Sequence, residues 1–282
     1  MRVGHRQFAM RRVMIMAAPN GARRTKAENP ALPMTADELA ECAAKLPDLG
    51  ASVLHLHVRD REGRHTLDVD AYRAAMLRIG ERTGDALIIQ VTTEAAGLYS
   101  AGEQMALVRA LRPEAVSLAL RELCPNEASE PAAATFFSWL AGERIWPQYI
   151  LHSVDDLERF EAMRRRGLFA EDCPSCLLVL GRYGDERSGD PAELDSWLSS
   201  VDSRVPWSVC CFGPREHEAA CAALEAGGHV RIGFENNLLL ADGGLARDNA
   251  TLIAQFTATL VQSKRRPATA DEVREEFIGG RT

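Results

Sequence analysis

Residues 53–60 read Val-Leu-His-Leu-His-Val-Arg-Asp, so apolar side chains alternate with histidines. This period of two is typical of a β-strand, because successive side chains point to opposite faces. Similar apolar runs recur along the whole chain, and most contain Val, Ile or Leu at consecutive positions, as buried parallel strands do. The predicted strands are Val13–Ala18, Val53–Val58, Ala86–Thr92, Ala115–Leu118, Ile145–Leu151, Cys176–Leu180, Trp207–Cys211 and Val230–Phe234.

Signals for the start of a helix lie between these runs. Capping pairs, in which a side chain accepts a hydrogen bond from a backbone N–H group, and prolines suited to a first turn mark them. The signals are Thr35 with Glu38, Ser100 with Glu103, Ser153, Asp190 with Pro191, Pro214, and Thr269 with Glu272.

Strand–helix alternation repeated about eight times predicts an α/β fold, a closed (β/α)8 TIM barrel. We expect residues 1–282 to form a single barrel domain with a C-terminal helical extension. The alternative is an open doubly wound sheet, which a glycine-rich turn after the first strand would favour. Residues 19–22, Pro-Asn-Gly-Ala, do not match that turn.

Composition excludes several classes of protein. The 282 residues are 46% hydrophobic and 26% charged, with a net charge of -7. A mildly acidic chain without a basic block is a poor nucleic-acid binder, and no apolar run approaches the roughly 20 residues that span a bilayer. The seven cysteines are odd in number and scattered, which favours a reducing cytoplasm.

The run at residues 53–60 also carries the first candidate site residues. The apolar side chains at positions 54, 56 and 58 share one face, so His55 and His57 share the other and point into the barrel mouth. Two imidazoles at this spacing, about 7 Å apart at Cα, can bind one ion. A pair of hydrogen-bonded core histidines is the alternative interpretation.

The last predicted strand carries a third candidate ligand. By the same alternation, Arg231, Gly233 and Glu235 face inward, only one strand away from the two histidines in a closed barrel. Glu235 can therefore complete a set of two histidines and one carboxylate. Such ligands favour Zn2+, and Fe2+, Mn2+ and Co2+ are not excluded. The alternative is an ion pair between Arg231 and Glu235.

Other polar residues lie at the predicted carboxyl ends of the strands, where barrel enzymes place their active sites. They can hold a substrate carboxylate or carbonyl group, and they are Asn20, Gln90, Thr92, Thr93, Ser117 and Gln148. The spacing of Cys173 and Cys176 is typical of redox or zinc sites. No second pair follows at a matching spacing, so we interpret these cysteines as core or loop residues.

Together, these segments resemble the β-keto acid cleavage enzymes, the family of 3-keto-5-aminohexanoate cleavage protein. The matching pieces run from the first predicted strand to the last, at residues 18–27, 55–60, 90–93 and 227–235. The resemblance implies a zinc-dependent (β/α)8 barrel, a homotetramer, and a role like that in lysine fermentation. It also implies condensation of a β-keto acid with acetyl-CoA, which gives acetoacetate and a new acyl-CoA.

The resemblance also implies roles for individual residues. By position, the family's zinc ligands, its active-site arginine and its substrate-contacting hydroxyls correspond to His55, His57 and Glu235, to Arg231, and to Thr92 and Ser117. Arg215 follows the seventh predicted strand, at a barrel end that often binds phosphate, and is a candidate for contacting the CoA phosphates.

The chain departs from the family pattern at the residues for proton transfer. Asn236 replaces the acidic residue that usually follows the metal-binding glutamate, and an amide cannot accept a proton at neutral pH. Gln148 stands where a strand-five carboxylate is expected. Our hypothesis is that Glu94 or Glu122, in loops where the family lacks carboxylates, takes this role; solvated surface charges are the alternative. The candidate catalytic residues are Arg231, Asn236, Glu94 and Glu122.

Two other functions stay open at this point. A metal-dependent barrel hydrolase also uses a His-x-His pair, typically on its first strand with further histidines on strands five and six. Here His152 ends strand five, but strand six has no histidine. The other alternative, motivated by Asn236, is a zinc-binding protein with altered or lost turnover.

Overall fold

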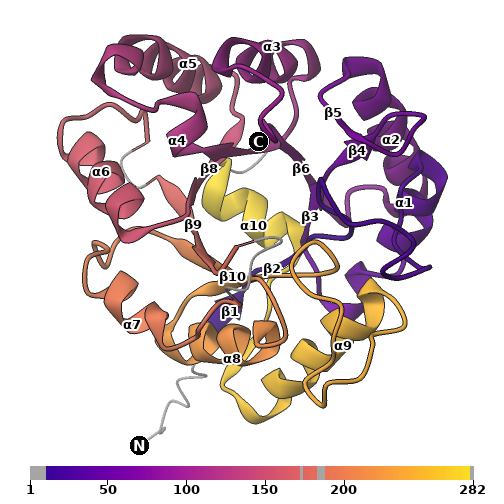
Figure 1. The fold of residues 1–282 in the computed structure, drawn as a ribbon. Coiled ribbons are helices and arrows are strands. Elements are labelled where there is room, and N and C mark those ends of the chain that lie inside the picture. Colours follow the sequence, from indigo (N-terminus) through magenta and orange to yellow (C-terminus); the bar gives the residue numbers. More distant parts are fainter. Residues whose placement is uncertain (1–10, 172–173, 183–187, 280–282) are drawn as a thin grey trace, which may run out of the picture.

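The computed structural model describes residues 11–171, 174–182 and 188–279, which form a closed barrel of parallel strands surrounded by helices (Figure 1). The TIM barrel predicted from the sequence is confirmed. Each strand pairs with the next along the barrel, and the last pairs with the first through Val230 and Ile15. The strands are β2 (Ile15–Ala17), β3 (Val53–Leu56), β6 (Ile88–Thr92), β7 (Ala115–Ala119), β8 (Trp146–Leu151), β9 (Ser175–Leu180), β10 (Trp207–Cys211) and β11 (His229–Ile232).

Helices follow the strands and cover the outside of the barrel. They are α1 (Ala36–Ala43), α2 (Val69–Thr83), α3 (Ala101–Leu111), α4 (Leu120–Leu123), α5 (Glu130–Gly142), α6 (Val154–Arg165), α7 (Glu193–Leu198), α8 (Glu216–Ala226), α9 (Asn249–Thr259) and α10 (Ala270–Phe277). The predicted capping boxes are confirmed at the starts of α1, α3 and α10.

The helix predicted to start at Asp190 begins two residues late. Ala192 occupies the cap position of α7. The carboxylate of Asp190 instead accepts a hydrogen bond from the backbone N–H of Ala192 and pairs with Arg215 on the next helix. A side-chain ion pair therefore competes with the capping role that the sequence predicts for this residue.

Five predicted strands are shorter in the structure, and the first and the last of them differ in ways that affect the site. The first run divides into β1 (Arg11–Val13), which pairs with β12 (Arg265–Pro267) outside the barrel, and β2 inside it. The last strand ends at Ile232, before a turn that carries Glu235. Glu235 is thus positioned by this turn and not by strand alternation.

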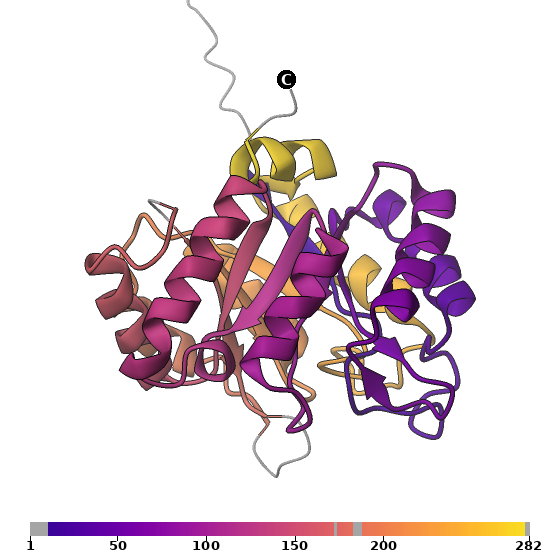
Figure 2. The same ribbon diagram turned by 90° about the horizontal axis from the view of Figure 1, so that it is seen from above.

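The two ends of the barrel have different interiors. At the amino ends of the strands, Met14, Met16 and Trp146 pack in an apolar cluster with Val273 of α10. Figure 2 shows α10 on one side of the barrel and the hairpin of β4 (Val58–Arg59) and β5 (His65–Thr66) on the opposite side. Because the amino ends are closed by apolar packing, the polar carboxyl ends are left to form a site.

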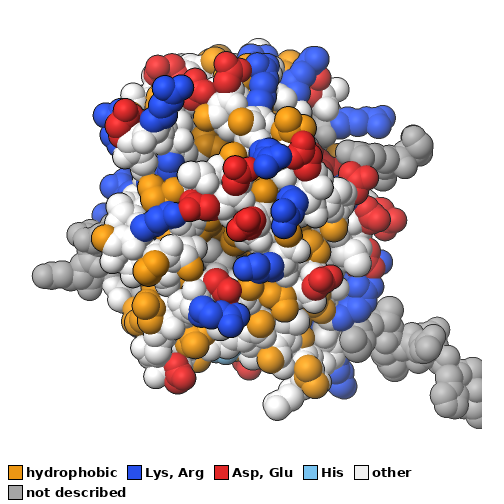
Figure 3. Space-filling model, turned by 90° about the vertical axis from the view of Figure 1, so that its right-hand side faces the viewer, with side chains coloured by type: hydrophobic (Ala, Val, Ile, Leu, Met, Phe, Trp, Pro, Cys, Tyr) orange, Lys and Arg blue, Asp and Glu red, His pale blue; other side chains and the backbone are white. Residues whose placement is uncertain are grey.

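The surface has mixed charge. Figure 3 shows basic and acidic side chains interspersed over one face of the molecule. Within the described ranges, no helix combines the length and the apolar character needed to cross a bilayer.

Candidate active site

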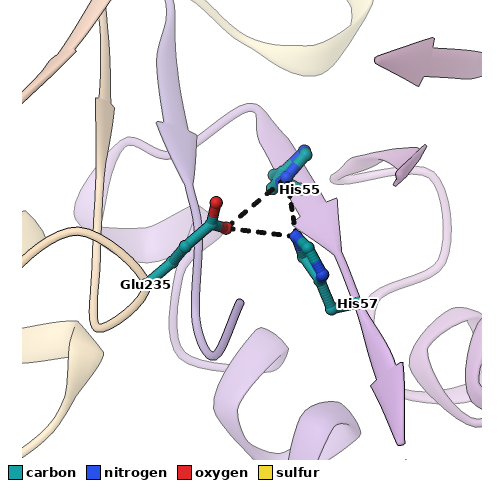
Figure 4. A group of neighbouring side chains, drawn as sticks. All are labelled: His55, His57 and Glu235. Atoms are coloured by element: carbon teal, nitrogen blue, oxygen red, sulfur yellow. Dashed lines mark hydrogen bonds and ion pairs between the residues drawn. The ribbon is translucent and has the colours of Figure 1, made fainter. Parts of the chain in front are cut away.

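Two histidines and one carboxylate converge at the carboxyl ends of β3 and β11. The Nε2 atoms of His55 and His57 are 3.1 Å apart, and Oε2 of Glu235 lies 3.5 and 3.4 Å from them (Figure 4). Both histidines are 1% exposed. The three residues are therefore brought together as the sequence predicts, at the carboxyl ends of two strands that only β2 separates.

A chain of amides orients the ring of His55. The amide nitrogen of Gln148 donates to Ser208, and the amide nitrogen of Gln90 donates to the side-chain oxygen of Gln148. This leaves Oε1 of Gln90 as an acceptor facing His55, so Nδ1 of His55 donates to it at 2.8 Å. Burial lowers the pKa of His55 to about 3, so the ring is neutral near pH 7. With the proton on Nδ1, the lone pair of Nε2 points toward His57 and Glu235.

This donor set fits a divalent cation. Oε2 of Glu235 is buried and has no hydrogen-bond partner among the described residues, although two ring nitrogens face it. Burial would raise the pKa of Glu235, but the charge of Arg231 and the two imidazoles outweigh burial and hold that pKa well below its ordinary value. An ionised carboxylate oxygen and two imidazole nitrogens that converge on one point are ligands that suit Zn2+.

Glycines shape the turn that presents Glu235. A Cβ atom at Gly233, where φ is +150°, would lie 2.3 Å from the carbonyl oxygen of Ala18. A Cβ atom at Gly21, where φ is +60°, would lie 2.5 Å from Cγ of Glu235. Arg59 holds this second loop in place by donating to the Gly21 carbonyl oxygen from Nε at 3.0 Å. The turn after β11 and the loop after β2 can therefore approach only with glycine at both positions.

A buried carboxylate, Glu216, holds the same turn from α8. It is 3% exposed and accepts hydrogen bonds from the backbone N–H of Gly233 and from the amides of Asn236 and Asn237. Sequence reasoning missed this residue, since a glutamate in the first turn of a helix is ordinarily a solvated partner of the helix dipole. Nothing near it in the sequence indicates that it is buried.

We expect Glu216 to make stability depend on pH. Burial raises the pKa of Glu216 to about 8, despite the hydrogen bonds from Asn236 and Gly233. The folded state then holds a proton that the unfolded state releases at lower pH, so stability falls as pH rises toward 8. The Glu216→Gln variant mimics the protonated form. The wild type should therefore lose stability relative to this variant as pH rises. The difference between their free energies of unfolding should change by up to about 1.4 kcal/mol per pH unit between pH 5 and 8.

Urea unfolding of the metal-free proteins at several pH values measures this difference. Glu225→Gln, an exposed change on the same helix, is the matched control and should follow the wild-type curve. Parallel pH curves for the wild type and Glu216→Gln would show that Glu216 is ionised in the folded protein.

Glu235 takes part in two arrangements at once: an ion pair with Arg231 and the candidate set of metal ligands. Nη2 of Arg231 lies 3.1 Å from Oε1 of Glu235 and also 3.1 Å from Oδ1 of Asn236. The two interpretations of Glu235 from the sequence, metal ligand and ion-pair partner of Arg231, are therefore compatible, because one carboxylate oxygen faces the arginine and the other faces the histidines. Asn236 is fully buried between Arg231 and Glu216, so its position suits orientation of Arg231 and not direct contact with a substrate.

A pocket of about 280 Å³ opens over the three candidate ligands. Thr92 and Ser117 line it, and the hydroxyl of Ser117 has no partner among the described residues. The remaining candidate substrate-binding residues are absent from its described lining. Their side chains instead donate to His57, Gln148, Ser117 and Ser208, and they are Asn20, Gln90, Thr93 and Gln148. A larger hollow of about 990 Å³, between α8, the end of α9 and β12, is lined by none of the candidate site residues.

The two candidate bases occupy different positions in the pocket. Glu94 is 29% exposed, with Oε2 3.9 Å from Nδ1 of His57 and Oε1 3.9 Å from Arg23. Glu122 accepts a hydrogen bond from the backbone N–H of Ala95 at 2.9 Å, and burial raises its pKa. The carboxylate of Glu94 is therefore the one next to a candidate metal ligand.

Two further candidates from the sequence take other roles. Arg215 pairs with Asp190 and Glu218, so its charge is already compensated and the expected contact with CoA phosphates loses its basis. Cys176 is buried in the core, and Cys173 lies outside the described residues.

Comparison with known proteins places this geometry in context. The sequence pattern described as beta-keto acid cleavage enzyme matches residues 12–277. The chain is 28% identical to the 3-keto-5-aminohexanoate cleavage enzyme of Fusobacterium nucleatum, over 94% of this chain and 97% of that protein. It is 27% identical to the 3-oxoadipate:acetyl-CoA acetyltransferase of Cupriavidus necator, over 93% of each. The structure of ObcA bound to oxaloacetate shares the fold, with a TM-score of 0.71 at 17% identity over 88% of this chain and 67% of that one.

Proposed function

This chain belongs to the β-keto acid cleavage enzyme family, and on that premise we propose that it is a metal-dependent carbon–carbon bond cleaving transferase. It condenses a β-keto acid with acetyl-CoA and releases acetoacetate and a new acyl-CoA. The observation that carries the proposal is the convergence of His55, His57 and Glu235 in a pocket at the barrel mouth.

His55, His57 and Glu235 would hold the cation, with Zn2+ favoured by the mixed nitrogen and oxygen ligands. A cation bound there supplies Lewis-acid polarisation of the substrate carbonyl group. Gln90 keeps Nε2 of His55 available, and Arg231 keeps Glu235 ionised and turned toward the histidines. Arg231 also lines the pocket, and although Nη2 pairs with Glu235, its Nε has no hydrogen-bond partner among the described residues and can donate to the carboxylate of the β-keto acid.

Proton transfer falls to Glu94 in this proposal. Its carboxylate accepts a proton from C2 of the β-keto acid, and C2 then bonds to the carbonyl carbon of acetyl-CoA as the CoA thiolate leaves. The thiolate attacks the original ketone carbon, the bond from that carbon to C2 breaks, and Glu94 returns the proton to acetoacetate. The free hydroxyl of Ser117 is placed to donate to a substrate oxygen in the same pocket.

Substrate names among the relatives differ in the charge of the tail. The Fusobacterium nucleatum relative is named for a substrate with an amine, and the Cupriavidus necator relative for one with a second carboxylate. Family membership alone therefore leaves the tail of this chain's substrate undefined. A cytoplasmic location and a homotetramer also stay predictions; the six described cysteines, all free thiols, support the first of them.

Metal analysis combined with a substrate panel tests the proposed function. We expect one divalent ion per chain by mass spectrometry of the purified protein. Acetoacetate should form from a panel of β-keto acids only when acetyl-CoA is present. Turnover without CoA would indicate a hydrolase, and bound metal without any CoA-dependent turnover would indicate that the reaction was lost; either result overturns the proposal.

A further inference from the structure

Cationic and imidazole side chains gather on the side of the pocket opposite the candidate metal ligands. Arg121 follows β7, His152 follows β8 and Arg182 follows β9, and all three line the pocket. The strand β8 is four strands from β2 in either direction around the barrel, whereas the metal ligands flank β2 (Figure 1). A molecule held at the metal ligands must therefore cross the barrel mouth to reach these three residues.

The side chains of the two arginines form no direct contact with a carboxylate within the described part of the chain. Neither guanidinium group forms an ion pair or hydrogen bond there, whereas that of Arg231 in the same pocket pairs with Glu235. Glu122, next to Arg121 in sequence, lines the same pocket; it accepts a hydrogen bond from the backbone N–H of Ala95, and burial raises its pKa although the charge of Arg121 opposes that shift. Among the described residues that line this side of the pocket, two guanidinium groups accompany one carboxylate, so this described lining has an excess of positive charge.

His152 shows the same electrostatic environment. Its side chain is 22% exposed, and its buried Nδ1 has no hydrogen-bond partner among the described residues, although Oδ2 of Asp156, which accepts from the backbone N–H of His152, lies 4.0 Å away. Burial first, and then the positive charges of Arg121, Arg231 and Arg182, lower the pKa of His152 to about 3. The ring is thus neutral near pH 7, and it can donate one N–H to an anion beside the two guanidinium groups.

We propose that Arg121, His152 and Arg182 form an anion-binding subsite that receives the distal carboxylate of the substrate. The substrate is then a β-keto dicarboxylate, with its keto acid end at the metal ligands and its second carboxylate across the barrel mouth. This inference rests on the proposed function for the keto acid end. The same three donors also suit a phosphate of CoA, so the experiment separates these two sources of negative charge.

Two substrates of equal length test the subsite kinetically: a six-carbon β-keto dicarboxylate and the analogue in which the distal carboxylate is an amide. We expect the wild type to prefer the carboxylate in kcat/KM by at least tenfold. In Arg121→Gln and Arg182→Gln that preference should fall at least tenfold. Arg82→Gln, an exposed change on α2 outside the pocket, should keep the wild-type preference.

Binding without turnover provides a second measurement. Glutarate should raise the melting temperature of the wild type more than its half-amide does, and Arg121→Gln should remove that difference. An unchanged preference in both arginine variants overturns the subsite. A raised KM for acetyl-CoA with an unchanged preference assigns the anion to CoA and overturns the substrate class. Absence of acetyl-CoA-dependent turnover in the wild type contradicts the proposed function, whereas the glutarate measurement still tests the subsite.

Discussion

His57→Ala is expected to remove stoichiometric metal from the protein and to lower kcat/KM by roughly 10³-fold or more. Nε2 of His57 lies 3.1 Å from Nε2 of His55 and 3.4 Å from Oε2 of Glu235, so its removal leaves two ligands. Lewis-acid stabilisation is worth several kcal/mol, and each 1.4 kcal/mol is a factor of ten in rate. Metal content by mass spectrometry and steady-state kinetics measure the two effects.

His217→Ala is the matched control, because it removes a half-buried imidazole from α8, outside the described lining of the pocket. It should keep both the metal and the activity. The alanine at position 57 leaves the backbone carbonyl that accepts from Asn20 unchanged, so a folded protein is expected, and circular dichroism checks this. A folded His57→Ala protein with one metal per chain would contradict the ligand set.

The barrel was predictable because its strands are buried on both faces. Consecutive Val, Ile and Leu residues are needed wherever a strand lies between helices and a packed interior. Leu54, Leu56 and Val58 pack in the main core, so the alternation also placed His55 and His57 correctly inside. Local sequence therefore carried the information for the fold and for two of the three candidate ligands.

Strand alternation predicted that Glu235 lies close to the two histidines, and the structure places it there by a different cause. The strand ends at Ile232, and Glu235 is presented by a turn that depends on Gly233, Gly21 and Glu216. These residues are far apart in sequence and meet only after the barrel closes. No local pattern could predict that a glutamate in the first turn of α8 accepts three hydrogen bonds from a loop.

Long-range contacts also explain which polar residues line the pocket. Thr93 follows the carboxyl end of β6, as predicted, but its hydroxyl donates to the Ser117 carbonyl on the neighbouring strand β7. Gln148 lies in the middle of β8 and not at its carboxyl end, and its amide donates to Ser208 on β10, two strands away around the barrel. Arg182 went unnoticed because a single arginine after a strand is ordinarily solvated. Its position beside His152 becomes significant only when β8 and β9 are adjacent.

Glu94→Gln is expected to lower kcat by about 10²- to 10⁴-fold, which is the usual contribution of a positioned general base. The glutamine keeps the size of the side chain but cannot accept a proton. Oε2 of Glu94 lies 3.9 Å from Nδ1 of His57, so the lost group is next to a candidate ligand without being one. Metal content should therefore stay at the wild-type level while turnover falls.

Glu122→Gln makes the same chemical change in the same pocket and separates the two candidates. Its glutamine oxygen can still accept from the backbone N–H of Ala95, so the loop is retained and a loss below tenfold is expected. Exchange of the C2 proton of the β-keto acid with deuterium, followed by NMR without acetyl-CoA, isolates the proton-transfer step. Glu94→Gln should abolish the enzyme-dependent exchange and Glu122→Gln should retain it. The opposite result would assign the base to Glu122, and full turnover in both variants would remove both carboxylates from the mechanism.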